Sequence, residues 1–107
     1  MLSQQEIIAR VKTGLERLYG ERLERIILYG SRARGDNRED SDFDFMVVLK
    51  GGPIEGVEEI FGTIDKVSYP IWEETYLKIH CFHIDSERFH NAKTPLLYWV
   101  RKEGKEI

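Results

Sequence analysis

The sequence predicts an α/β or α+β fold, in which helices cover a small β-sheet. Apolar residues recur at helical spacing in three segments, and short runs rich in β-branched and aromatic residues lie among those segments. This alternation is typical of a sheet with helices packed on it. A chain of 107 residues is long enough for one hydrophobic core and too short for two ordinary domains. We therefore expect a single domain over residues 1–107.

The first helix is predicted from Ser3 to about Tyr19. Ser3 and Glu6 have the spacing of a capping box, in which each side chain bonds the other residue's backbone amide. The apolar residues that follow at helical intervals are Ile7, Ile8, Val11, Leu15 and Leu18. Gly20 is the residue type that commonly ends a helix, although Gly14 inside the run costs roughly 1 kcal/mol relative to alanine.

Two further helices are predicted. Residues 54–75 keep a helical rhythm, and we expect this helix to kink or stop near Pro70, since proline lacks the amide that a helix interior uses. Thr94 followed by Pro95 is typical of a helix start, and Gly104 would end that helix. Its stretch "LLYWV" is more apolar than one face of a short helix can bury, so part of it is expected to meet a partner chain.

Three runs have the composition of strands. They are "RIILYG" (25–30), "FDFMVVL" (43–49) and "YLKIHCFHI" (76–84), and a polar loop over residues 32–41 joins the first two. The residues Lys50, Gly51, Gly52 and Pro53 would end the second strand.

Composition and charge exclude several classes of function. A formal net charge of -3 gives the chain no electrostatic reason to bind long DNA or RNA. No apolar run approaches the roughly 20 residues that span a bilayer, and the N-terminus lacks a signal-peptide pattern. The single cysteine, Cys81, cannot form an internal disulfide. We expect a cytoplasmic protein, and one that could still bind a small phosphate compound through local arginines and backbone amides.

Asp42 and Asp44 lie at the start of the second strand. Because alternate residues of a strand share a face, their carboxylates would lie close together and repel each other unless a cation lies between them. Hard oxygen ligands of this kind suit Mg²⁺, which prefers few carboxylates together with phosphates and water. An isolated S-D-x-D sequence is nevertheless at least as typical of a solvated strand start with turn residues.

Gly30 and Ser31 lie where the first strand ends and the chain turns. Free backbone amides at such a turn, together with a serine hydroxyl, can form a pocket for phosphate oxygens, and glycine allows close approach. An ordinary turn is the commoner meaning of a lone Gly-Ser pair. A phosphate site at the end of one strand and a carboxylate pair at the start of the next would together hold a nucleoside triphosphate with its metal.

The two motifs together resemble a known family. "GSRARG" (30–35) followed by "SDFD" (41–44) is similar to the G-S-x-A-R-G and S-D-x-D signature of minimal nucleotidyltransferases, within the polymerase-β-type superfamily. The resemblance implies a small mixed sheet covered by helices. It also implies that Gly30, Ser31 and Arg34 contact the nucleotide and that Asp42 and Asp44 bind Mg²⁺. The implied reaction is attack of a hydroxyl on the α-phosphorus of ATP, with pyrophosphate as the leaving group.

One element of the family pattern is missing. A third carboxylate usually lies on a later strand, and in "LKIHCFHI" the best-aligned position holds His80. Histidine can accept a proton at neutral pH but is a poor ligand for Mg²⁺. Glu73, Glu74 and Asp85 are the acids that could substitute if the strand register differs.

The resemblance also implies a partner. The chain is too short for the additional helical domain with which larger relatives hold their acceptor, so a small helical protein of the HEPN type would present the hydroxyl. That protein would be a ribonuclease toxin and this chain its antitoxin. Two alternatives stay open: a catalytically weak relative that neutralises the same partner by binding, and a homodimeric scaffold without nucleotide chemistry.

Other candidate groups have structural explanations that involve no function. Arg32 and Arg38 alternate with acidic residues and are as typical of a solvated loop as of a phosphate site, and Arg34 could equally brace the loop. In "HCFH" strand alternation directs His80 and His83 to opposite faces, which argues against a zinc site.

Overall fold

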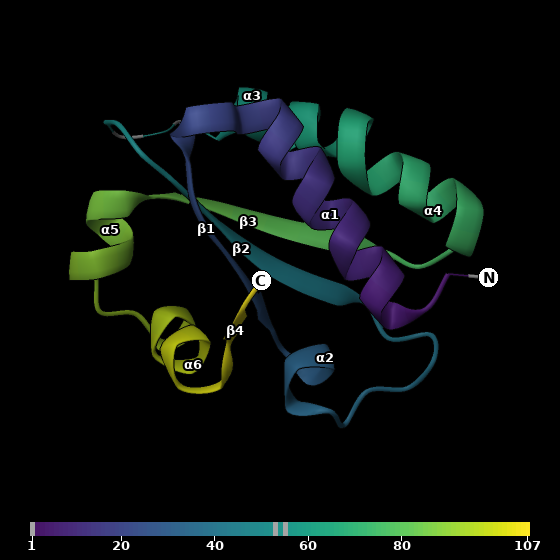
Figure 1. Ribbon diagram of the computed structural model, residues 1–107. Helices are drawn as coiled ribbons and strands as arrows, with labels where there is room; N and C mark the ends of the chain where they lie inside the picture. The colour runs from purple at the N-terminus through teal and green to yellow at the C-terminus, as the bar shows by residue number, and fades with distance from the viewer. Residues whose placement is uncertain (1, 53, 55) are drawn as a thin grey trace.

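The computed structural model describes residues 2–52, 54 and 56–107, and its centre is a four-stranded mixed sheet (Figure 1). The strands are β1 (Leu23–Tyr29), β2 (Phe43–Leu49), β3 (Ile79–Asp85) and β4 (Lys105–Glu106), in the order β3-β2-β1-β4. β1 runs antiparallel to β2 and β4, whereas β2 and β3 are parallel. The predicted fold class is therefore confirmed.

Helices cover both faces of this sheet (Figure 1). On one face lie α1 (Gln4–Tyr19), which the short turn η1 (Gly20–Arg22) follows, and the helical segment α3 (Val57–Thr63), η2 (Ile64–Ser68) and α4 (Tyr69–Thr75). On the other face lie α5 (Ser86–Asn91) and α6 (Pro95–Glu103). Every residue of β2 except Asp44 is buried, because β2 lies in the interior of the sheet and has helices on both sides. A half-buried carboxylate in such a strand points to a function.

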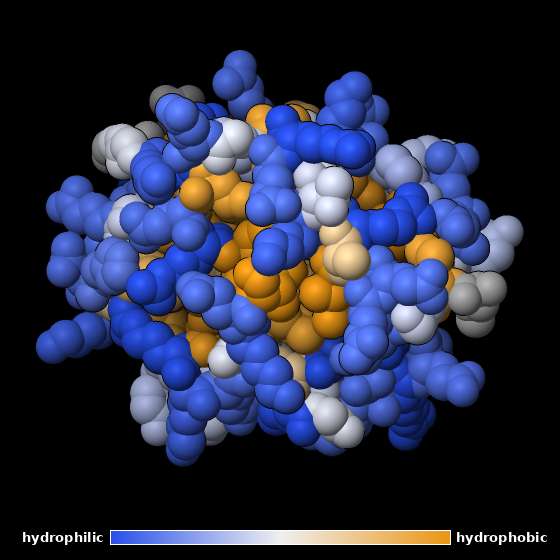
Figure 2. Space-filling view, viewed as in Figure 1, coloured by the Kyte–Doolittle hydropathy of each residue, from blue (hydrophilic) through white to orange (hydrophobic). Residues whose placement is uncertain are grey.

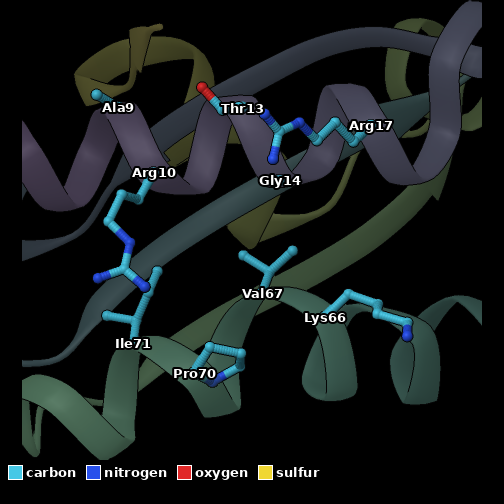
Figure 3. Close-up of a pocket in the computed structure, with 9 residues that line it drawn as sticks. All are labelled: Ala9, Arg10, Thr13, Gly14, Arg17, Lys66, Val67, Pro70 and Ile71. Atoms are coloured by element: carbon cyan, nitrogen blue, oxygen red, sulfur yellow. The ribbon is translucent and has the colours of Figure 1, made fainter.

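α1 begins as the sequence predicts. The Ser3 hydroxyl accepts a hydrogen bond from the Glu6 amide at 3.1 Å, and the Glu6 carboxylate accepts one from the Ser3 amide at 3.0 Å. Close packing explains why residue 14 is glycine: a Cβ at this position would lie 2.9 Å from Cγ2 of Val67 in η2. A groove of about 330 Å³ runs between α1 and the η2–α4 segment at this close approach, with Val67 directly beneath Gly14 (Figure 3). This groove is lined by none of the predicted site residues.

The helix over residues 57–75 does not stop near Pro70, so of the two expected outcomes, a kink or a stop, the stop is wrong. Residues 64–68 wind as a π-helix, and the chain then continues helically through Pro70 to Thr75. Proline has no amide to donate, and the wider turn before it allows the helix to continue without that hydrogen bond. The predicted start at residue 54 is also too early, since Gly56 caps a helix that begins at Val57. Pro53 lies outside the described residues.

The third strand is displaced from its predicted range of 76–84. Tyr76 has φ of 59° and caps α4, so β3 begins only at Ile79 and extends to Asp85. Asp85 then caps α5 by accepting a hydrogen bond from the Arg88 amide at 3.0 Å. α5 and the short β4 were not predicted from the sequence. α6 begins at Pro95 with Thr94 as its N-cap and ends before Gly104, as expected.

Large apolar side chains remain exposed along the α3–η2–α4 segment and on α6. The most exposed are Val57, Ile60, Phe61, Ile64, Tyr69, Trp72 and Tyr76 in the first group and Tyr98 and Trp99 in the second. Figure 2, seen from the same side as Figure 1, shows apolar side chains gathered in the middle of the visible face, surrounded by polar ones. Within the described residues, no helix is both long and apolar enough to span a bilayer.

Candidate functional site

The turn after β1 has an unusual backbone. Gly30 adopts φ of 76° and ψ of -159°, a conformation that residues with a side chain rarely take. Its carbonyl accepts hydrogen bonds from the amides of Ala33 and Arg34, at 3.0 and 3.1 Å, which starts the short helix α2 (Ser31–Arg34). Ser31 is thus the first helical residue, directly after the glycine.

Gly30 and Asp44 touch. A Cβ built on Gly30 would lie 2.7 Å from Oδ2 of Asp44, closer than real contacts allow. The antiparallel register explains this proximity, because Tyr29 pairs with Asp44. The absence of a side chain at residue 30 therefore leaves room for the Asp44 carboxylate directly beside the turn.

His80 completes the group from the next strand. It pairs with Asp44 in the parallel register of β2 and β3, and its Nε2 lies 3.0 Å from Oδ2 of Asp42. The register is extended by the Phe43 amide, which donates to the carbonyl of Lys78 at 2.9 Å. The structure thus brings Gly30, Asp42, Asp44 and His80 together where β1 ends and β2 and β3 begin.

The site carries negative charge that the described residues only partly neutralise. Burial raises the pKa of Asp44, the nearby His80 works against that rise, and the charge of Asp42 adds to it. Tyr29, which sequence reasoning did not single out, has its pKa raised to about 12, first by burial and then by Asp44. Burial thus makes the ionised form of Asp44 more costly than it is in water, and a bound cation would offset that cost.

The donor set fits a hard divalent cation that is completed by a ligand. Asp42 and Asp44 supply carboxylate oxygens from one end of β2, and Asp42 is about half exposed. Within residues 2–52, 54 and 56–107, no group of three or more His, Cys, Asp or Glu is arranged to hold a metal by itself. Mg²⁺ commonly takes only one or two protein carboxylates and obtains its other oxygens from phosphates and water.

None of the three alternative acids reaches this site. Asp85 is the last residue of β3 and pairs with Leu49, at the opposite end of β2 from Asp44. Glu74 forms an ion pair with Arg10 of α1, and Glu73 is exposed on α4. Among the described residues, His80 thus occupies the position opposite Asp44 where the family pattern would place a third carboxylate.

Of the loop arginines, Arg38 is exposed, in keeping with a solvated loop, whereas Arg32 differs from expectation. Arg32 is buried rather than solvated, which corrects the prediction: it donates to the carbonyls of Glu39 and Ser41, each at 2.9 Å. Its guanidinium also lies 4.3 Å from the centroid of the Phe43 ring. Arg32 therefore braces the loop. Arg34, for which bracing was one of two expected roles, donates to Asp36 of the same loop at 3.1 Å. The Arg38 amide donates to the Ser41 hydroxyl at 2.8 Å.

The "HCFH" residues line one pocket of about 320 Å³, but within the described part of the chain they form no metal site. The Nε2 atom of His83 lies 2.9 Å from Thr63 Oγ1 and 3.0 Å from the Tyr19 hydroxyl, away from His80. Cys81 packs against the core on the side of α1, and burial raises its pKa to about 12. Strand alternation separates these residues as predicted.

The fold and the motifs are those of a nucleotidyltransferase. The model of the nucleotidyltransferase domain family matches residues 8–93, and the chain belongs to this family. It is 42% identical over 48 residues to MJ0141 of Methanocaldococcus jannaschii and 38% identical over 47 residues to MJ0604 of the same organism. Protein adenylyltransferase activity has been proposed for both relatives. The matches cover 45% and 44% of this chain, and the chain spans 48% and 47% of those proteins, about half their length.

Solved structures share the fold. A toxin-antitoxin structure with AMP-PNP superimposes with a TM-score of 0.62 at 17% identity, over 97% of this chain and 72% of that one. A mutant of the toxin-antitoxin MntA-HpeT gives a TM-score of 0.60 at 18% identity, over 100% of this chain and 72% of that one. These likenesses show a shared fold, and the family match confirms the expected resemblance to nucleotidyltransferases.

Proposed function

We propose that this chain is a Mg²⁺-dependent nucleotidyltransferase that transfers AMP from ATP to a hydroxyl group of a partner protein in the cytoplasm. The partner is a small helical protein of the HEPN type, and the chain serves as the antitoxin of that pair. Family membership, relatives with proposed protein adenylyltransferase activity and the toxin-antitoxin structures of the same fold support this proposal.

One observation carries the proposal: Asp44 lies directly against the Gly30 turn, with Asp42 and His80 beside it. A turn with the first amides of α2 and a pair of carboxylates are each common, but their contact creates one place for phosphate oxygens and a cation. Burial and the charge of Asp42, which both raise the pKa of Asp44, are further reasons to expect a cation here.

The described residues divide the work of the reaction. Gly30 and Ser31 bind the triphosphate, and Arg34 adds positive charge next to them. Asp42 and Asp44 hold Mg²⁺, which when bound supplies positive charge to the phosphates and the leaving group. The acceptor oxygen attacks the α-phosphorus, the bond from that phosphorus to the bridging oxygen breaks, and pyrophosphate leaves. The hydroxyl proton passes to His80, which lies opposite Asp44 and can accept a proton at neutral pH.

The exposed apolar side chains support a protein partner. Val57, Ile60, Phe61, Ile64 and Tyr69 are each between 46% and 68% exposed and follow one another along a single helical segment. A run of this kind is unusual on a small monomeric protein and is typical of an interaction surface.

The decisive experiment measures the mass of the partner. The chain is mixed with its proposed HEPN-type partner, ATP and Mg²⁺, and the mass of the partner is measured by mass spectrometry. We expect a gain of one AMP that disappears in Asp42→Asn and on chelation of the metal. Fragmentation of the modified partner then identifies the acceptor hydroxyl.

A second candidate function follows from the missing third carboxylate. With His80 in its place, the chain would bind the partner and neutralise it without efficient transfer. This function is favoured if the partner's mass is unchanged and a tight complex persists in Asp42→Asn. His80→Asp, which restores an acid opposite Asp44, would then be expected to raise transfer.

A further inference from the structure

Arg34 is held from two sides next to the nucleotide turn. Its Nε donates to Asp36 Oδ2 at 3.1 Å, and its Nη1 donates to Glu103 Oε2 at 3.2 Å. The Arg34 amide also donates to the carbonyl of Gly30 at 3.1 Å, so Arg34 lies directly at the turn. Arg34 is therefore close enough to influence the site while two acids already neutralise it.

The position of Glu103 is fixed by the packing of the chain end. Glu103 is the last residue of α6, whose side chains Leu97 and Val100 are buried against the sheet. Gly104 follows, and a Cβ there would lie 2.4 Å from the Val100 carbonyl oxygen and 2.5 Å from Cγ2 of Ile27. β4 then pairs with β1, the strand that leads into the Gly30 turn. This tight connection holds the Glu103 carboxylate beside α2, where α6 and α2 approach each other (Figure 1).

Glu103 and a bound phosphate would make opposite demands on Arg34. When a guanidinium bonds two carboxylates, their negative charges offset its positive charge and occupy some of its N–H donors. It must release one of them to form a bidentate contact with phosphate. Glu103 also places a negative charge close to the triphosphate. Both effects weaken nucleotide binding, and both depend on the carboxylate rather than on the shape of the side chain.

We propose that Glu103 competes with the nucleotide's phosphates for Arg34 and thereby lowers the affinity of the site for ATP. This inference rests on the proposed function, since it assumes that a nucleoside triphosphate binds at the Gly30 turn. Glu103 is a positioning residue: it acts through Arg34 and does not touch the substrate. The contact links α6 to the nucleotide site, so a displacement of α6 would free Arg34 to bind phosphate.

The test replaces the charge and keeps the shape. ATP binding with Mg²⁺ is titrated calorimetrically for the wild type and for Glu103→Gln, and we expect the variant to bind about two- to fivefold more tightly, the range of an exposed or half-exposed ion pair. The gain should shrink as salt is raised. Glu106→Gln is the matched control, because Glu106 lies three residues further along the chain and pairs with Arg25 instead.

A second comparison separates charge competition from a change in folding. In an Arg34→Gln background, Glu103→Gln should lose most of its effect, since the competed group is gone. A merely structural role for Glu103 predicts weaker binding and a lower unfolding midpoint, which would overturn the inference. Equal affinity of wild type and Glu103→Gln would overturn it as well and would leave the proposed function standing. Absence of ATP binding in every variant would overturn both.

Discussion

The contact between Gly30 and Asp44 joins the two sequence motifs at the scale of single residues. Gly30 provides a positive φ and an empty side-chain position, and Asp44 Oδ2 fills the space in which a Cβ would lie. Phosphate binding at the turn and metal binding at the strand therefore depend on one another. A change at residue 30 should damage both, although the residue has no functional group.

We predict that Gly30→Ala loses ATP binding at least tenfold and destabilises the fold by about 1–3 kcal/mol, the usual cost of a strained backbone. Its methyl group would displace the Asp44 carboxylate, which lies 2.7 Å from the added atom. Calorimetric titration with ATP and Mg²⁺ measures the first effect, and denaturant unfolding measures the second. Gly20→Ala is the control, because Gly20 has φ of 55° and no atom within 4 Å of an added Cβ. It should show the strain without the loss of binding.

The residues of the site differ in how well the sequence could predict their positions. Asp42, Asp44, Gly30 and Ser31 follow from local rules, namely strand alternation and turn chemistry. Arg32 could not be placed this way, because its partners are carbonyls brought close only by the folded loop and the ring of Phe43. The sequence shows that Arg32 is charged, but the partners that bury it are visible only in the folded structure.

At the scale of elements, the chain end shows how a short connection can control the position of a helix. α6 and β4 are separated by Gly104 alone, and this glycine packs against Val100 and Ile27 without space for a side chain. Its φ of -66° is one that any residue adopts, so the requirement for glycine here comes from packing.

Gly104→Ala should therefore destabilise the protein through overpacking, by about 1–3 kcal/mol. The added methyl group would meet backbone at 2.4 Å, which cannot give way as a flexible side chain would. Thermal or denaturant unfolding measures the change, and Gly52→Ala, with nothing within 4 Å of an added Cβ, serves as the control. Equal stability of the two variants would contradict the packing argument.

Elements with strong local signals could be predicted, and those that depend on neighbours could not. The capping box fixes the start of α1, and the apolar run 43–49 is β2 in full. The range of β3 was wrong because Tyr76 caps α4 in a left-handed conformation that favours glycine or asparagine. The helix was not expected to continue past Pro70, because the sequence does not reveal the π-helical turn that precedes this proline.

At the scale of the whole molecule, His83 of β3 connects two helices, α1 and α3, that cover one face of the sheet. Its Nε2 lies within hydrogen-bond distance of Tyr19 of α1 and Thr63 of α3, and the Tyr19 hydroxyl also donates to the Glu59 carbonyl at 3.0 Å. Among the described residues, the Nδ1 atom of His83 is buried without a hydrogen-bond partner. A protonated imidazole would be poorly satisfied there.

The pH dependence of stability should reflect this histidine. Burial lowers the pKa of His83, and the charge of Glu59 opposes the change. The unfolded chain then binds the proton more strongly than the folded one, so stability should fall as pH drops through the unfolded pKa of about 6.5. Unfolding midpoints at a series of pH values from neutral to mildly acidic should decrease in the wild type and change less in His83→Gln, which keeps a polar group without the titration. His90→Gln, at an exposed histidine 3.3 Å from Glu24, should retain the wild-type slope because His90 is not buried among these elements. A wild type whose midpoint does not fall, or a His83→Gln variant with an unaltered slope, would show that the folded protein tolerates the charge and that this cluster does not set its acid stability.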